Sequence, residues 1–319
     1  MPLPPAVVCL GEALIDRLGP PGGDPCVDEP REDRLGGAPA NVACGLARLG
    51  TAVTFLGRLG QDAIGDDFAA LFQQREVEVG SVQWDEQRPS RIVLVRRRTD
   101  GEREFQGFAG DRGLGFADQA LAPVLVPSAA RWLLVGSLPL ASSPSAESLQ
   151  GAVAQAKASG IALALDVNWR PTFWDRSADP AAGPTNQAIA QIRPLLEQAA
   201  LIKLAREEAL WFFSSEDPAV IRAALPQQPD VVVTDGAAPV RWCLEDQAGA
   251  QAAFQPPRVV DTTGAGDAFT AGLLHRWAAA PVERVRFAAA CGALVCSGPG
   301  GIDPQPTEAQ VTRFLGGVS

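Results

Sequence analysis

The segment Asp261-Thr-Thr-Gly-Ala-Gly-Asp267 is a turn of small residues that opens an apolar helix and places a carboxylate in its first turn. Gly264, Ala265 and Gly266 leave their backbone N–H groups uncovered, and the N-terminus of a helix attracts anions. A carboxylate among anion donors suits phosphoryl transfer, because the amides stabilise the transferring group while Asp267 accepts the proton of the attacking hydroxyl. An ordinary capped helix is the alternative, and this segment alone does not decide between them.

Composition excludes several classes of partner. The 319 residues carry a net charge of −10 and a pI of about 4.7, which argues against nucleic acid and anionic membranes. No apolar stretch approaches eighteen residues, and residues 1–10 lack the charge and length of a signal peptide. The six cysteines form no Cys-x-x-Cys pair and read as reduced, buried thiols. We therefore expect a cytoplasmic protein without a membrane segment.

The residue types that are scarce in this chain, histidine and lysine, exclude several catalytic and phosphate-binding motifs. His275 is the one histidine and lies well inside the helix after Asp267, so a structural role is expected and a His-dependent triad is excluded. The two lysines, Lys157 and Lys203, do not follow a glycine, so no Walker A motif is present. A protein with this composition has to bind nucleotide phosphates with backbone amides, arginine and a metal ion.

Short apolar runs alternate with helical patterns along the chain. The expected strands are Ala6–Leu10, Val53–Leu56, Trp132–Gly136, Ile161–Val167, Leu201–Leu204, Val231–Thr234 and Val240–Leu244. The expected helices are Asn41–Leu49, Gly65–Gln74, Ser145–Ala158 and Thr185–Gln198, followed by a mostly helical C-terminal third. Continuous apolar strands predict a parallel sheet covered on both faces, and hence a three-layer α/β/α sandwich in a single domain over residues 1–319.

Two segments depart from this alternation. Residues 16–35 are rich in Gly, Pro and charge, and residues 91–110 alternate apolar and polar side chains. We expect them to form a small antiparallel β-lid over the sheet edge. Two exposed loops are the alternative.

Further polar residues stand where ligand contacts are expected. Asp16 closes Gly11-Glu-Ala-Leu-Ile-Asp16 after the first strand, where open α/β sheets bind ligands. Gly36 and Gly37 precede a helix that carries Asn41, an amide able both to donate to and to accept from a hydroxyl. Each of these is weak alone, because solvated turn residues look the same.

The nucleotide side is expected after the later strands. Asn168 and Arg170 follow the strand ending near Val167, and Arg170 would supply the charge that a missing P-loop lysine otherwise gives. Glu208 stands at a helix start, either as a capping charge or as a magnesium ligand through water. Thr234 and Gly236 close another strand and border the nucleotide in this interpretation.

Together these segments resemble the PfkB, or ribokinase-like, family of carbohydrate kinases over nearly the whole chain. The two family signatures correspond to Gly36–Gly50 and Asp261–Leu274. The resemblance implies a central sheet between helices, a β-lid over the sugar, and ATP-dependent transfer to a primary hydroxyl. The family's Asn-x-x-Glu pattern is altered to Ala205-Arg-Glu-Glu208, and its second glycine after Gly236 is replaced by Pro239.

The resemblance also implies roles for individual residues. Asp267 is implied as the catalytic base, and Gly264, Ala265 and Gly266 as the anion hole. The implied sugar contacts are Asp16, Gly36, Gly37, Asn41, Phe105 and Arg170. The implied nucleotide contacts are Asn168, Lys203, Thr234, Gly236, Gly264 and Gly266. The implied metal residues are Glu208 for Mg²⁺, and Asp261 and Thr263, with the 297–301 loop, for a monovalent cation expected to be K⁺.

Within the family, the segments ending at Asp16, beginning at Gly36 and spanning Asp166–Arg170 are most similar to fructokinases. We therefore expect transfer of the ATP γ-phosphoryl to the C6 hydroxyl of D-fructose by a monomer or homodimer. A 2-keto-3-deoxygluconate kinase, a ribokinase or another kinase of the family is the nearest alternative, and a non-catalytic sugar-binding relative is a second. An oxidoreductase is disfavoured because the chain lacks a Gly-x-Gly-x-x-Gly fingerprint.

Overall fold

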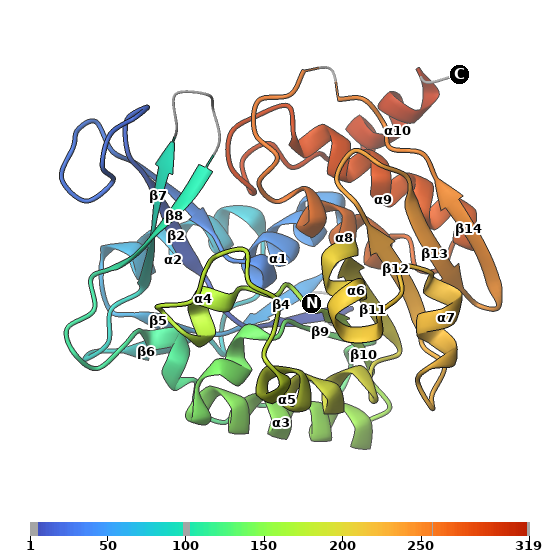
Figure 1. Cartoon of the computed structure of the whole chain (residues 1–319), viewed down its shortest axis with the longest axis horizontal. Helices are drawn as coiled ribbons and strands as arrows, with labels where there is room; N and C mark the ends of the chain where they lie inside the picture. Colours follow the sequence, from blue (N-terminus) through green and yellow to red (C-terminus); the bar gives the residue numbers. More distant parts are fainter. Residues whose placement is uncertain (1–5, 98–102, 257, 318–319) are drawn as a thin grey trace.

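The computed structural model describes residues 6–97, 103–256 and 258–317, so residues 98–102 of the expected lid and the extreme N-terminus lie outside the described residues. Its centre is an eight-stranded sheet in the order β14-β13-β12-β11-β10-β9-β1-β4 (Figure 1). These strands are β1 (Val7–Leu10), β4 (Val53–Leu56), β9 (Trp132–Val135), β10 (Ala162–Asp166), β11 (Leu201–Ala205), β12 (Asp230–Thr234), β13 (Val240–Leu244) and β14 (Gln247–Gln251).

The sheet is mixed, which corrects the expectation of a wholly parallel one. Strands β4, β1 and β9 to β12 are parallel neighbours, whereas β13 and β14 run antiparallel at the edge. Only residues 235–239 join β12 to β13, and Ala238 N–H donates to the Asp235 carbonyl across this turn at 2.8 Å. Such a turn is too short for the crossover that a parallel pair needs.

Helices cover both faces, which confirms the predicted three-layer α/β/α fold. One face carries α1 (Ala38–Leu49), α2 (Ala63–Arg75), α8 (Ala265–His275), α9 (Pro281–Val295) and α10 (Glu308–Gly316). The other carries α3 (Ser143–Ala158), α5 (Asn186–Leu196), α6 (Arg206–Phe213) and α7 (Pro218–Ala223), as Figure 1 shows for α3 and α5. In β1, Val7 and Cys9 enter the first core while Val8 and Leu10 enter the second. Both sides of that strand are buried, which explains its unbroken apolar sequence.

A second, four-stranded sheet stands off the central one in the order β3-β2-β7-β8 (Figure 1). Its strands are β2 (Leu14–Leu18), β3 (Glu32–Gly36), β7 (Arg91–Arg97) and β8 (Arg103–Ala109). The two segments expected to form a lid therefore meet in one sheet. The expected antiparallel arrangement is wrong for its centre, where β2 and β7 are parallel with Asp16 opposite Val93. The chain between these strands passes through α1 and α2, a connection long enough for a parallel pair.

Short elements complete the fold. They are the parallel pair β5 (Arg58–Gly60) and β6 (Gln83–Asp85), the one-turn helix α4 (Pro171–Trp174), and the 3-10 turns η1 (Ala117–Ala120) and η2 (Leu138–Ala141). Of the helices in the described ranges, none combines the length and apolar character needed to cross a membrane.

Candidate active site

The turn before α8 has a conformation that its glycine makes possible. Gly264 has φ of 76°, and a Cβ atom placed on it would lie 2.5 Å from the Cα atom of Gly301. Asp261 fixes the same turn, because its Oδ2 accepts the Gly300 N–H at 2.7 Å and its Oδ1 accepts the Thr263 N–H at 2.9 Å. The hydrogen bonds of Asp261 thus hold the first turn of α8 against the loop around residues 300–301. Residues 262–267 line a cavity, and the Ala265 N–H donates to the Thr262 carbonyl at 3.2 Å within the turn.

Asp267 lies in that first turn, as predicted, and α1 orients it. The Asn41 Nδ2 atom donates to Asp267 Oδ2 at 2.7 Å. Burial, together with the nearby Asp166 carboxylate, raises the pKa of Asp267 to about 6. The Asn41 hydrogen bond and the charges of Lys203 and Arg170 oppose this rise. Asp267 is therefore ionised at neutral pH and a stronger base than an ordinary aspartate.

A buried ion pair lies beneath the same turn. Lys203 Nζ in β11 is 2.9 and 3.1 Å from the two carboxylate oxygens of Asp166 in β10. Burial alone would lower the pKa of Lys203, but the neighbouring carboxylates of Asp166, Glu208 and Asp267 outweigh it and raise that pKa above its ordinary value. A Cβ atom on Gly266 would lie 3.0 Å from Lys203 Nζ, so a full positive charge stands against the backbone of α8. Asp166 was not among the predicted site residues, although it ends a strongly apolar strand.

A cavity of about 540 Å³ opens in front of this turn, between the lid strands and the carboxyl ends of the core strands. Most predicted residues are brought together there: Asp16, Gly37, Asn41, Phe105, Asn168, Arg170, Lys203, Thr263, Gly264, Ala265, Gly266 and Asp267. Gly36 stands behind the cavity, where a Cβ atom would lie 3.7 Å from Asp16 Oδ2. Gly37 has φ of 99° and packs against the Glu12 backbone, so close main-chain approach explains this glycine better than ligand contact does.

A second cavity of about 350 Å³ lies on the other side of the same turn. It contains the predicted Thr234 and Gly236, but continues past them along an apolar wall that includes Val240, Phe254 and Phe269. Thr262, Ala265 and Gly266 line both cavities. The first turn of α8 therefore separates a polar cavity, which suits a hydroxylated ligand, from an apolar one, which suits a flat base.

The predicted metal residues have protein partners. Glu208 accepts the Trp169 N–H at 2.6 Å and the Ala205 N–H at 2.7 Å, so it links the segment after β10 to the end of β11. It is buried and lines neither of the two cavities described above. Asp261 and Thr263 lie beside the 300–301 loop, as described above. Across residues 6–97, 103–256 and 258–317, no group of three or more Asp, Glu, His or Cys side chains is arranged to hold a metal ion alone.

Comparison with known proteins assigns this arrangement to a family. Residues 5–308 match the description "pfkB family carbohydrate kinase". The chain belongs to this family. The carbohydrate kinase is 32% identical over 324 residues to "Fructokinase-1" of Zea mays, with 97% of each chain covered. It is 32% identical over 330 residues to "Fructokinase" of Salmonella typhimurium, with 95% of this chain and 97% of the relative covered.

Solved structures agree with this assignment. A fructokinase from Xylella fastidiosa with bound ATP superposes with a TM-score of 0.83 at 29% identity, covering 98% of this kinase and 99% of that chain. A fructokinase from Vibrio cholerae O395 with fructose, ADP and calcium bound superposes with a TM-score of 0.81 at 27% identity, over 98% and 99% of the two chains. The resemblance inferred from the glycine-rich segments is thereby confirmed.

Proposed function

We propose that this carbohydrate kinase transfers the γ-phosphoryl group of ATP to the C6 hydroxyl of D-fructose, giving fructose 6-phosphate and ADP. The observation that carries the proposal is that the first turn of α8 lies between a polar and an apolar cavity, with Asp267 on the polar side. A sugar in the first cavity and a nucleotide in the second would meet at this turn alone, because Thr262, Ala265 and Gly266 line both.

On the sugar side, Asp267 acts as the base. Its pKa of about 6 is far below that of an alcohol, so it accepts the C6 proton as the new P–O bond forms and not before. Asn41 holds the carboxylate through the 2.7 Å hydrogen bond, leaving Oδ1 for the hydroxyl. Asp16 and Arg170 line the same cavity and bind the remaining hydroxyls. Closure of the lid over the sugar keeps water from competing as the acceptor.

On the phosphoryl side, the backbone N–H groups of residues 264–266 stabilise the negative charge of the transferring group. Lys203 adds a positive charge from beneath the turn. Mg²⁺ bound with ATP would neutralise the triphosphate, and Glu208 is the residue of this chain that would contact its water ligands. Asp261, Thr263 and the 297–301 loop would hold K⁺ beside the same turn.

Fructose is favoured over other sugars by the relatives that this chain resembles. The plant and bacterial proteins above carry the name fructokinase, and the Vibrio cholerae structure holds fructose. The carboxylate Asp16 in the sugar cavity suits a neutral, hydroxyl-rich acceptor. Arg170 lines the same cavity, and its positive charge suits an acidic sugar. The nearest alternative acceptor is therefore 2-keto-3-deoxygluconate.

The test is an ADP-release assay with ATP, Mg²⁺ and K⁺ that compares fructose, 2-keto-3-deoxygluconate, ribose, glucose and adenosine. We expect the highest kcat/KM with fructose and a product phosphorylated at C6 by NMR. A higher kcat/KM with another acceptor would keep the mechanism and replace the substrate. Absence of ADP formation with all five acceptors would overturn the proposal in favour of a non-catalytic relative.

A further inference from the structure

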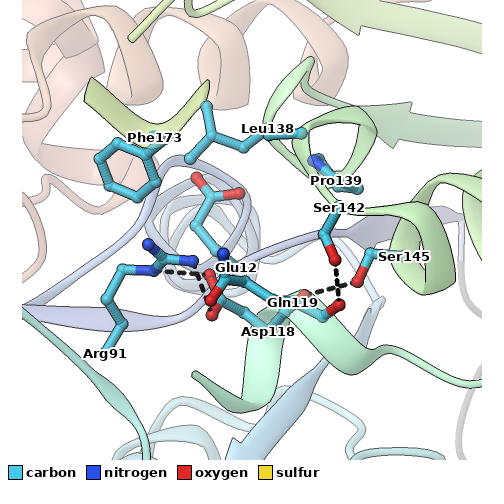
Figure 2. Close-up of a pocket in the computed structure, with 10 residues that line it drawn as sticks. Glu12, Arg91, Asp118, Gln119, Leu138, Pro139, Ser142, Ser145 and Phe173 are labelled. Atoms are coloured by element: carbon cyan, nitrogen blue, oxygen red, sulfur yellow. Dashed lines mark hydrogen bonds and ion pairs between the residues drawn. The ribbon is translucent and has the colours of Figure 1, made fainter. Parts of the chain in front are cut away.

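A carboxyl group that this mechanism does not use lies in the wall of the sugar cavity. Glu12 follows β1 and is only 4% exposed. It lines both the 540 Å³ sugar cavity and a separate cavity of about 20 Å³, together with Leu138 and Phe173. Figure 2 shows the Glu12 carboxyl group pointing toward these two side chains. Glu12, Leu138 and Phe173 therefore form a partition between the small cavity and the cavity proposed for the sugar.

The contacts of Glu12 lead toward the reacting atoms. Its Oε1 accepts the N–H of Ala38, the first residue of α1, at 3.1 Å. Its backbone packs so closely against the same helix start that a Cβ atom on Gly37 would lie 2.7 Å from the Glu12 carbonyl oxygen. One turn later Asn41 donates to Asp267. Glu12 thus holds the end of the helix that orients the proposed base.

The cation that lines the small cavity beside Glu12 is Arg91, and it is already paired with another carboxylate. Asp118 of η1 faces the small cavity, but both of its oxygens are bound by Arg91 of β7 at 2.9 and 3.0 Å. Arg91 is further enclosed by the rings of Phe108, Phe116 and Phe173, each within 5.0 Å of its guanidinium carbon. This arginine is therefore already neutralised, as the ion pair in Figure 2 shows.

Asp267 of α8 and Asp16 of β2 line the larger cavity together with Glu12, and the charge of Asp267 adds to the same effect. Burial, followed by the charges of Asp118 and Asp267, raises the pKa of Glu12 to about 8, although the backbone N–H groups of Glu12 and Ala38 oppose the rise. Within the described residues, Glu12 Oε2 has no hydrogen-bond partner. The small cavity has the size of about one water molecule, which would accept a hydrogen bond from the protonated form of this oxygen.

We propose that Glu12 is a positioning residue that must stay neutral for the first turn of α1 to hold Asn41 and Asp267 in their reactive arrangement. A buried carboxylate without a cation is costly, so an ionised Glu12 would draw water into the partition and shift the helix start. It would also repel the ionised Asp267. The inference rests on the proposed function, because the reactive arrangement is that of the kinase step.

The kinetic test compares the wild type, Glu12→Gln and Glu12→Ala across pH 5.5 to 9.5. The wild type should lose kcat/KM below about pH 6, where Asp267 is protonated, and again above about pH 8. Glu12→Gln is uncharged and of equal size, so it should keep activity near pH 7 and lose the alkaline decline. Glu12→Ala should lower kcat by about 10- to 100-fold with a smaller change in the KM for sugar, because misplacement acts on the base. An unchanged alkaline decline in Glu12→Gln would overturn the proposal.

A second measurement does not depend on turnover. The infrared C=O stretch of a protonated carboxyl group should disappear between pH 7 and pH 9.5 in the wild type and be absent throughout in Glu12→Gln. The exposed Glu147 of α3 provides the control, since Glu147→Gln should leave both this band and the pH profile unchanged. If no acceptor is phosphorylated, the proposed function fails while the infrared titration still reports on Glu12. If the wild type is active and this band does not titrate, the inference about Glu12 fails alone.

Discussion

Replacing Asp267 by asparagine should remove activity and at the same time stabilise the fold. Burial and the charge of Asp166 raise the pKa of Asp267 from 3.8 to about 6, which means that folding disfavours its ionised form. A pKa difference of about 2, at about 1.4 kcal/mol for each pKa unit, corresponds to about 3 kcal/mol. Asp267 is partly exposed to the sugar cavity, so solvent screening reduces the expected gain to roughly 2 kcal/mol.

The raised pKa of Asp267 determines how the stability difference between Asp267→Asn and the wild type changes with pH. An acid whose pKa is raised by folding contributes stability below its unfolded pKa and loses that contribution as the pH rises through the folded value. Asp267→Asn should therefore be more stable than the wild type above about pH 6, and the difference should vanish near pH 4. The asparagine oxygen still accepts from Asn41, so the hydrogen bond at 2.7 Å is retained.

Urea unfolding at pH 8 and at pH 4, together with kcat at pH 8, measures the effect. We expect kcat to fall by about 10²- to 10⁴-fold, the usual contribution of a positioned base. Glu86→Gln removes one negative charge from an exposed position and serves as the control for net charge. A variant no more stable than the wild type at pH 8, or equally stabilised at both pH values, would refute the electrostatic argument. A near-normal kcat would remove Asp267 from the role of base.

Three further changes test other parts of the site. Gly264→Ala should cost about 1–3 kcal/mol and most of the activity, since φ is 76° and the added methyl meets backbone at 2.5 Å; Gly151→Ala in α3, with open space around it, should instead raise the melting temperature. Lys203→Met should destabilise by roughly 3–5 kcal/mol in urea unfolding by leaving Asp166 buried without its partner, and adding Asp166→Asn should restore much of the loss. His275→Gln should leave kcat unchanged. Because burial lowers the pKa of His275, wild-type folding is penalised as the pH falls, so the stability of this variant relative to wild type should improve from pH 8 to pH 5.

The helices and strands that face the core were predictable because each shows the spacing of apolar residues that packing against a core requires. The seven expected strands are all present, and expected helices such as Ser145–Ala158 differ by only a few residues from their bounds, here Ser143–Ala158. Strand β14 was missed because Gln247-Ala-Gly-Ala-Gln251 is an almost fully exposed edge strand without apolar alternation. Its pairing depends on the turn after β13, where Glu245 and Asp246 adopt positive φ.

The candidate site was predictable where backbone geometry demands a residue type. Gly264 and Asp267 belong to one local segment, and their arrangement follows from the start of a helix. Glu12 and Asp166 were not predictable as site residues, because their roles depend on partners such as Ala38 and Lys203 that lie 26 and 37 residues away. In the sequence, a charged residue at the end of an apolar run is equally compatible with a solvated turn. Only the folded structure shows which residues it contacts.

The two cavities share only a short stretch of wall, so in the proposed function the nucleotide donor and the sugar acceptor are recognised by different residues. Among the described residues this stretch consists of Thr262, Ala265 and Gly266, two of which offer almost no side chain with which to recognise a ligand. In the proposed function, the residues that distinguish one sugar from another are therefore those of the lid, the ends of the strands and the segment 168–173 that line the larger cavity alone. Substitutions there can retune the acceptor while the nucleotide side and the reacting turn stay as they are. Such a scaffold allows new acceptor specificities to evolve without rebuilding the chemistry.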